Sequence, residues 1–201
     1  MRLKTLLVVV ALAVWFSVSA PKTFAQNLLT NGSFETGDFT GWNTGGNFED
    51  TEVVSGAFDQ YTGAEDGNFY VVMGPVGSDG TMGQTFSDHA GTQYTFSFWF
   101  AAVGDNPSDF SAYWDGTSVL SLTNPTTGGV WTQYSFNETG TGSDSISFSF
   151  RDDPAFMALD NVVVSSSSTS TTGTTPEPSS LILLGTGVLG LGGFARRKLI
   201  K

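Results

Sequence analysis

Hydrophobic and polar side chains alternate along several short stretches in the middle of the chain. Residues 94–100 place aromatic side chains at every second position, and residues 145–150 alternate serine with isoleucine or phenylalanine. This period of two predicts strands with one buried face. Residues 69–73 form a continuous apolar run, which predicts a strand covered on both faces. Residues 159–164 close the region with a third kind of run, rich in β-branched side chains.

Clusters of turn-forming residues separate these stretches. They are Gly45-Gly46-Asn47, Gly77-Ser78-Asp79-Gly80, Gly104-Asp105-Asn106-Pro107, Asn124-Pro125 and Gly140 to Asp144. Glycine, proline, asparagine and aspartate favour the backbone angles of tight turns. Short strands joined by frequent turns predict an all-β sandwich or barrel.

The N-terminal segment has the order of features of a secretory signal peptide. Arg2 and Lys4 are basic, and an apolar run follows from residue 6 to residue 18. We expect a signal helix and cleavage after Ala25, because Pro21 disfavours a cut after Ala20. The alternative is a signal anchor, but the run is shorter than the roughly 20 residues that span a bilayer.

Residues 26–164 have the length of one ordinary domain, and the next segment has a different composition. Residues 165–175 contain serine and threonine with a single glycine, so we expect a flexible stalk. The chain has no cysteine, which excludes disulfides and thiol chemistry.

Charge is distributed very unevenly along the chain. Only Arg151 among the eight basic residues lies between residues 26 and 175, whereas 18 of the 19 acidic residues do, so this region has a formal charge of −17. Binding to nucleic acid or anionic lipid requires basic residues that displace counterions. We therefore expect no nucleic-acid partner.

The C-terminal segment combines a short motif, an apolar run and a basic cluster. Pro176-Glu177-Pro178 precedes an uncharged run from Ser179 to Ala195, and Arg196-Arg197-Lys198 follows directly. The basic cluster predicts a cytoplasmic C-terminus. The run predicts a transmembrane helix at about residues 180–195, which its length and glycines make only marginally stable.

These residues resemble the PEP-CTERM family of sorting signals, over residues 176–201. The resemblance implies an exosortase partner, transient anchoring in the cytoplasmic membrane, removal of the tail, and a product at the cell surface or in the extracellular matrix. The expected processing leaves little of the chain beyond Pro178. An ordinary transmembrane anchor is the alternative.

The two ends of the predicted β domain carry a second resemblance. Residues 27–42 contain the Asn-Gly-Ser-Phe-Glu motif that ends at Glu35, and residues 159–162 contain Asp160. These segments resemble jelly-roll carbohydrate-binding modules of the galactose-binding-like type. That resemblance implies a structural calcium held by Glu35 and Asp160, with oxygen ligands as calcium prefers. The alternative is that both acids cap turns through backbone N–H groups.

A glycan-binding module needs exposed aromatic faces on which sugar rings stack. Trp99 is expected to face away from the aromatic row of its strand, and Tyr113 and Trp114 lie near a turn. We take these three as candidate ligand-binding residues, although core packing is the usual role of such side chains. Trp42 and Trp131 occupy positions that are expected to be core.

Catalytic patterns are weak in this sequence. The single histidine, His89, lies in a turn-like segment, and no nucleophile elbow, metal-protease histidine pair or phosphate loop occurs. The sequence therefore predicts a non-catalytic surface or matrix protein that associates with exopolysaccharide and binds glycan. A polysaccharide-active hydrolase on the same scaffold is the alternative function.

Overall fold

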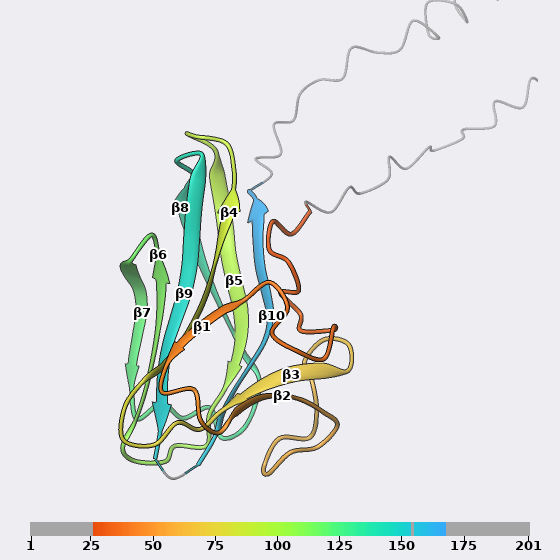
Figure 1. The fold of residues 1–201 in the computed structure, drawn as a ribbon, viewed down its shortest axis with the longest axis vertical. Coiled ribbons are helices and arrows are strands. Elements are labelled where there is room, and N and C mark those ends of the chain that lie inside the picture. Colours follow the sequence, from red (N-terminus) through yellow and green to blue (C-terminus); the bar gives the residue numbers. More distant parts are fainter. Residues whose placement is uncertain (1–25, 154, 168–201) are drawn as a thin grey trace, which may run out of the picture.

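The structure is a computed structural model that describes residues 26–153 and 155–167. Strands of this region form two five-stranded antiparallel sheets that pack face to face (Figure 1). The first sheet has the order β1-β4-β9-β6-β7, and the second has the order β2-β3-β10-β5-β8. The all-β sandwich is thus confirmed. The helices expected at the two ends of the chain lie outside the described residues.

The first sheet contains β1 (Asn43–Gly46), β4 (Gly80–Ser87), β9 (Ser143–Asp152), β6 (Ser108–Trp114) and β7 (Thr117–Thr123). The second contains β2 (Thr51–Ser55), β3 (Phe69–Met73), β10 (Met157–Ser166), β5 (Gln93–Ala101) and β8 (Thr132–Thr139). None of the described residues forms a helix that is long and apolar enough to cross a membrane.

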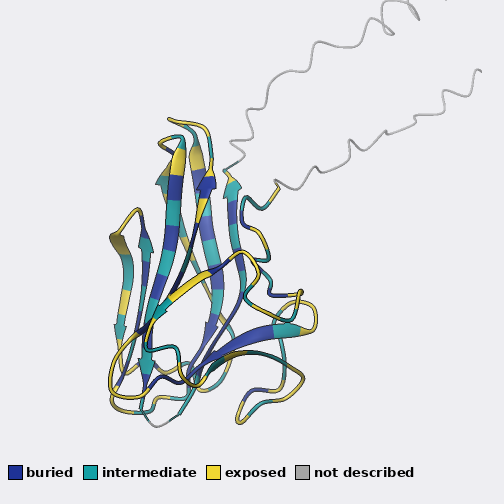
Figure 2. Cartoon of the chain, viewed as in Figure 1, coloured by how far each residue is buried: buried dark blue, intermediate teal, exposed yellow. Residues whose placement is uncertain are grey.

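Alternation along the sequence translates directly into buried and half-buried faces. In β5 and β9 every second side chain is buried, and Figure 2 shows the resulting bands along both strands. Six fully buried phenylalanines from β5, β6 and β9 form the centre of the core between the sheets: Phe96, Phe98, Phe100, Phe110, Phe148 and Phe150. Burial of apolar surface such as that of these rings is the main favourable contribution to folding.

The expectation that residues 69–73 are covered on both faces is also confirmed. Val71 and Met73 of β3 join the core between the sheets. Tyr70 and Val72 point to the other side, into a second cluster that includes Tyr61. The β2–β3 connection contributes Tyr61, so it forms a lid over one part of the outer face of the second sheet.

The first described segment lies along the last strand. The Leu28 N–H donates to the Val164 carbonyl at 2.8 Å, and the Val162 N–H donates to the Gly32 carbonyl at 2.8 Å. Strand β10 itself continues to Ser166, two residues beyond the expected end of the domain. The extension forms because Ser165 and Ser166 still pair with β5.

Candidate functional site

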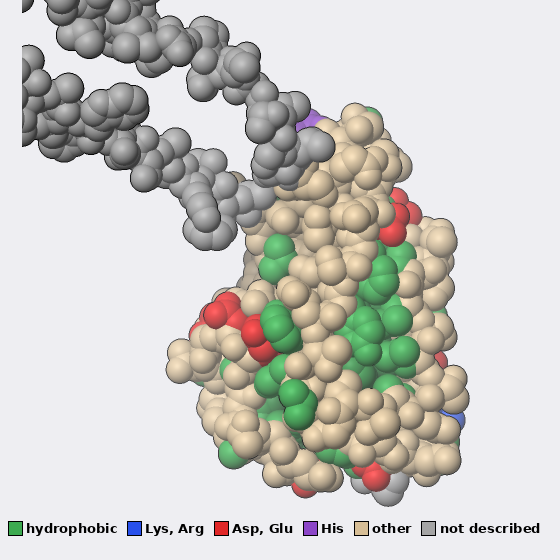
Figure 3. All heavy atoms as spheres, turned by 180° about the vertical axis from the view of Figure 1, so that it is seen from behind, with side chains coloured by type: hydrophobic (Ala, Val, Ile, Leu, Met, Phe, Trp, Pro, Cys, Tyr) green, Lys and Arg blue, Asp and Glu red, His purple; other side chains and the backbone are tan. Residues whose placement is uncertain are grey.

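A hollow of the described domain lies between edge strands β7 and β8 of the two sheets. It has a volume of about 580 Å³. Its lining residues are Trp114, Asp115, Thr117, Ser118, Val119, Phe136, Glu138, Thr139 and Thr141. Seen from behind, the molecule has a lengthwise band of hydrophobic side chains with acidic side chains beside its upper end (Figure 3). We call this hollow the β7/β8 cleft.

The apolar part of the cleft is an extension of the core. Phe136 projects from β8 toward the first sheet and remains half-buried, because β8 is an edge strand with no further strand beside it. Trp114 ends β6 with 5% of its surface exposed, and its ring packs edge-on against Phe86 at 5.5 Å between centroids. Val119 of β7 is half-buried on the opposite side. Packing therefore fixes the aromatic faces in place before any ligand is present.

The rim of the cleft is polar and carries acids. Asp115 has a positive φ of 46° in the β6–β7 turn, and its Oδ1 accepts hydrogen bonds from the Ser145 N–H at 2.7 Å and the Ser145 hydroxyl at 3.1 Å. Glu138 continues the inward face of β8 beyond Phe136. The polar residues Thr117, Ser118, Thr139 and Thr141 complete the lining. The cleft thus combines apolar ring faces with hydrogen-bonding groups and has no basic residue in its lining.

Two further acids lie behind this rim. Asp144 is fully buried, and its carboxylate accepts a hydrogen bond from the Thr141 N–H at 3.0 Å. Burial and the adjacent Asp144 carboxyl raise the pKa of Asp88, whereas hydrogen bonds hold the pKa of Asp144 below its ordinary value. Acidic side chains are therefore concentrated at this end of the cleft.

The structure separates the three candidate ligand-binding residues onto three surfaces. Trp114 lines the cleft. Tyr113, its neighbour in β6, points to the opposite side and lies between Ser147 and Ser118 on the outer face of the first sheet. Trp99 is half-buried on the outer face of the second sheet and lies between Gln133 and Asp160. They cannot bind one sugar together.

The other tryptophans lie where the sequence indicated. Trp42 is 7% exposed and stacks on Phe34 at 5.3 Å between ring centroids. Trp131 packs against Tyr61 and Tyr70, and its indole N–H donates to the Gly63 carbonyl at 3.1 Å. Both side chains serve packing.

Glu35 and Asp160 both contact the segment that precedes β3. Glu35 Oε1 accepts hydrogen bonds from the N–H groups of Asn68 at 2.7 Å and Phe69 at 2.9 Å, which lower its pKa. Asp160 Oδ2 accepts hydrogen bonds from the N–H groups of Glu65 at 2.8 Å and Asp66 at 3.0 Å. Each acid therefore caps one part of the same loop, as the alternative interpretation of the sequence described.

These contacts bear on the expected calcium. Asp160 is fully buried, and burial raises its pKa to about 7 despite its hydrogen bonds. Among residues 26–153 and 155–167, no three or more histidine, cysteine or acidic side chains gather closely enough to hold one ion. A calcium ion here would share the two carboxylates with the loop N–H groups and would need backbone carbonyls or water for its remaining ligands. The calcium site stays a prediction.

His89 is exposed in the β4–β5 turn, and its backbone N–H donates a hydrogen bond to the Tyr94 hydroxyl at 3.0 Å. The sorting residues Pro176, Glu177, Pro178, Arg196 and Arg197 lie outside the described residues. So do the signal peptide and most of the stalk.

Two family models match the chain in regions that do not overlap. A model described as a carbohydrate-binding domain matches residues 26–151, which is more than half of the chain. The chain belongs to this carbohydrate-binding domain family. A second model, described as a PEP-CTERM protein-sorting motif, matches residues 174–198. Both resemblances seen in the sequence are thereby confirmed, and the sorting motif marks this carbohydrate-binding domain protein as exported.

Solved structures share the fold at low identity. TmCBM61, solved in complex with beta-1,4-galactotriose, is 20% identical with a TM-score of 0.58, covering 71% of this chain and 100% of its own. The K1 cleaved adhesin domain of Lys-gingipain from Porphyromonas gingivalis W83 is 17% identical with a TM-score of 0.52, covering 67% and 96%. A cyclase from Fischerella sp. TAU is 14% identical with a TM-score of 0.52, covering 69% and 96%. No protein of curated function matches significantly.

Proposed function

We propose that this exported protein binds a glycan of the extracellular polysaccharide through the β7/β8 cleft, without acting on it chemically. The proposal is carried by one observation. In a member of a carbohydrate-binding domain family, a preformed cleft places the half-buried Phe136 ring and the 5% exposed Trp114 ring beside polar and acidic side chains. Its volume of about 580 Å³ lies within the range of ligand-binding pockets.

The chemistry of the lining suits a sugar. A pyranose ring has apolar C–H faces that pack against aromatic and aliphatic side chains, here Trp114, Phe136 and Val119. Its edge carries hydroxyl groups, which donate hydrogen bonds to carboxylate oxygens such as those of Glu138. Because the core holds Trp114 and Phe136 in place, little side-chain entropy is lost on binding.

The charge of the cleft limits which glycans can bind there. The lining contains two acids and no base, and Arg151, the one basic residue of the described domain, is paired with Asp153. A uronate or sulfated polymer would be repelled at low ionic strength. We therefore propose a glycan without acidic groups.

The test is isothermal titration of the full-length protein with soluble oligosaccharides. Galacto-oligosaccharides belong in the panel because TmCBM61 was solved with beta-1,4-galactotriose. Glu138→Ala should weaken binding at least tenfold, which corresponds to about 1.4 kcal/mol. Glu52→Ala is the matched control, because Glu52 is exposed on β2, the edge of the second sheet farthest from β8. If both variants bind with equal affinity, the glycan does not bind in the β7/β8 cleft. If the protein binds no glycan of the panel, the proposed function is wrong.

The sorting tail supports a proposal about location. The PEP-CTERM motif implies an exosortase partner in general. We propose that exosortase removes the tail after transient anchoring in the cytoplasmic membrane, and that the domain reaches the cell surface or matrix on its stalk. The alternative hydrolase function would need two carboxylates that flank the glycosidic bond, and Asp115, one of the two acids in the lining, is already engaged by the Ser145 N–H and the Ser145 hydroxyl.

A further inference from the structure

A second acidic region lies at the end of the sandwich opposite Asp88, and one of its carboxylates is isolated. Asp152 ends β9 on the core-facing side, opposite Ser108 of β6. The side chain is 2% exposed, and its Oδ1 has no hydrogen-bond partner among residues 26–153 and 155–167. Moving an uncompensated carboxylate from water into such a site costs several kcal/mol. Something that the described side chains do not supply must offset this cost.

Acids dominate the electrostatic environment of Asp152. Burial raises the pKa of the Asp152 carboxyl to about 7, and the charges of Asp105 and Asp153 add to the effect. Asp105 lies in the β5–β6 connection, where its carbonyl accepts a hydrogen bond of 2.7 Å from the Ser108 hydroxyl. Three segments, the β5–β6 connection, the start of β6 and the end of β9, therefore meet at this point.

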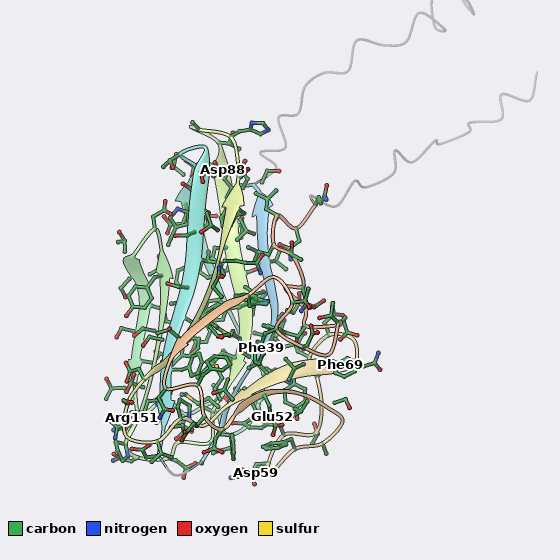
Figure 4. All side chains as sticks on the ribbon, in the orientation of Figure 1. Phe39, Glu52, Asp59, Phe69, Asp88 and Arg151 are labelled. Atoms are coloured by element: carbon green, nitrogen blue, oxygen red, sulfur yellow. The ribbon has the colours of Figure 1, made fainter. Side chains whose placement is uncertain are left out.

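The Tyr61 hydroxyl lies within electrostatic range of Asp152 and Asp105. Its pKa is raised by burial and then by Asp152, Asp59 and Asp105. The Tyr61 hydroxyl donates to the Phe156 carbonyl, so its oxygen remains free to accept. Figure 4 places Asp59 at the lower end of the molecule, away from Asp88 and the acidic end of the cleft.

No basic side chain of the described domain neutralises Asp152. Arg151 precedes it in β9, and alternation directs the guanidinium to the outer face, where it is paired with Asp153. The β6 residue opposite Asp152 is Ser108, whose hydroxyl donates to the Asp105 carbonyl, so oxygen-bearing groups of two segments meet at this point. A set of oxygen ligands with excess negative charge is the environment that calcium prefers.

We propose that Asp152 and Asp105 hold a calcium ion at this end of the sandwich and that the ion joins the β5–β6 connection to the end of β9. With two carboxylates, the ion would complete its six to eight ligands with carbonyl and hydroxyl oxygens and water. The site is separate from Glu35 and Asp160, which contact the loop before β3. It requires no glycan and is independent of the proposed function.

The first experiment counts calcium ions by isothermal titration into the chelator-treated, full-length protein at pH 7.5. Up to about 5 mM calcium is needed, because extracellular modules bind at roughly 0.1–1 mM. Asp152→Asn and Asp105→Asn should each lower the number of bound ions by one relative to the wild type. Asp79→Asn should leave the number unchanged, because the Asp79 carboxylate accepts a hydrogen bond from the Ser149 hydroxyl on the outer face of β9. An unchanged number in Asp152→Asn, or no calcium binding by the wild type, overturns the proposal.

The second experiment separates a calcium site from a merely protonated acid. In chelator, Asp152→Asn removes an uncompensated buried charge and should raise the melting temperature above that of the wild type. Addition of calcium should reduce this difference or reverse its sign, because only the wild type gains the ion at Asp152 and Asp105, whereas both proteins keep the Glu35 and Asp160 site. A difference that is the same with and without calcium shows that a proton alone neutralises Asp152, and the proposal is then wrong.

Discussion

Asp88 gives a sharp test of the electrostatics at the upper end of the molecule (Figure 4). Its Oδ1 accepts a hydrogen bond of 2.6 Å from the Gly142 N–H, whereas its Oδ2 is buried and no donor reaches it in the described residues. The adjacent Asp144 is fully buried. Folding raises the pKa of Asp88 above its ordinary value of 3.8, first because burial disfavours the ionised carboxylate and then because the Asp144 carboxyl lies beside it.

Asp88→Asn should therefore stabilise the protein at neutral pH. The retained oxygen can still accept from the Gly142 N–H, and the new NH₂ group replaces Oδ2 and donates to Asp144. A hydrogen bond to a charged group contributes about 1.5–3 kcal/mol. Asp88 is partly solvated, which weakens the interaction, so we expect a gain of about 1 kcal/mol, or about 3–4 °C in melting temperature for a domain of this size.

The sign of the pH dependence follows from the direction of the shift. A carboxyl whose pKa is higher in the folded state binds more protons folded than unfolded, so wild-type stability falls as pH rises from about 3.8 through the folded pKa. The variant lacks this fall, and its gain should be small near pH 3.5 and largest above neutral pH. Urea denaturation followed by tryptophan fluorescence at both pH values measures the gain, with Glu52→Gln as an exposed control. A destabilised variant at pH 7.5, or the same gain at both pH values, would refute the reasoning.

Three further predictions concern the core, the loop before β3 and the tail. Phe98→Ala removes a fully buried ring whose centroid lies 5.1 Å from that of Phe148, so we expect the free energy of unfolding, measured by urea denaturation, to fall by about 3–5 kcal/mol. The control Phe39→Ala removes a half-buried ring and should lower it clearly less. Equal losses would contradict the placement of the core. Calcium should raise the melting temperature of Asp152→Asn, which retains the Glu35 and Asp160 site, and the rise should disappear when Glu35→Ala is added; a rise that persists excludes Glu35 as a ligand. Mass spectrometry of the surface protein should find no attached peptide from residues 181–201, and its presence would disprove processing.

The strands were predictable because their signal is local. Period-two alternation depends only on which face of a strand is buried, so residues 94–100 and 145–150 were correctly placed within β5 and β9. The two-sided burial of β3 was predictable for the same reason, since an uninterrupted apolar run cannot leave one face in water. The end of β10 could not be predicted in this way. Ser165 and Ser166 belong to the strand because their backbones pair with β5, and this pairing does not depend on the polarity of their side chains.

The cleft could not be predicted because it depends on strand order. Phe136 and Glu138 belong to an ordinary alternating strand, and nothing in their sequence indicates that β8 is an edge strand facing β7. One part of the site could nevertheless be predicted from the sequence. Tyr113 and Trp114 are adjacent in a predicted β region, so alternation already places them on opposite faces, and only Trp114 reaches the cleft.

The position of the cleft agrees with the way in which the chain is exported. The described chain leaves the domain through β10, which lies in the middle of the second sheet, with β5 between it and β8. The cleft lies at the free edges of both sheets, between β7 and β8, so attachment through the C-terminal segment does not require any contact with its lining. A PEP-CTERM anchor and a carbohydrate-binding domain can therefore act at the same time, because the strand that connects to the anchor and the strands that form the cleft are different ones.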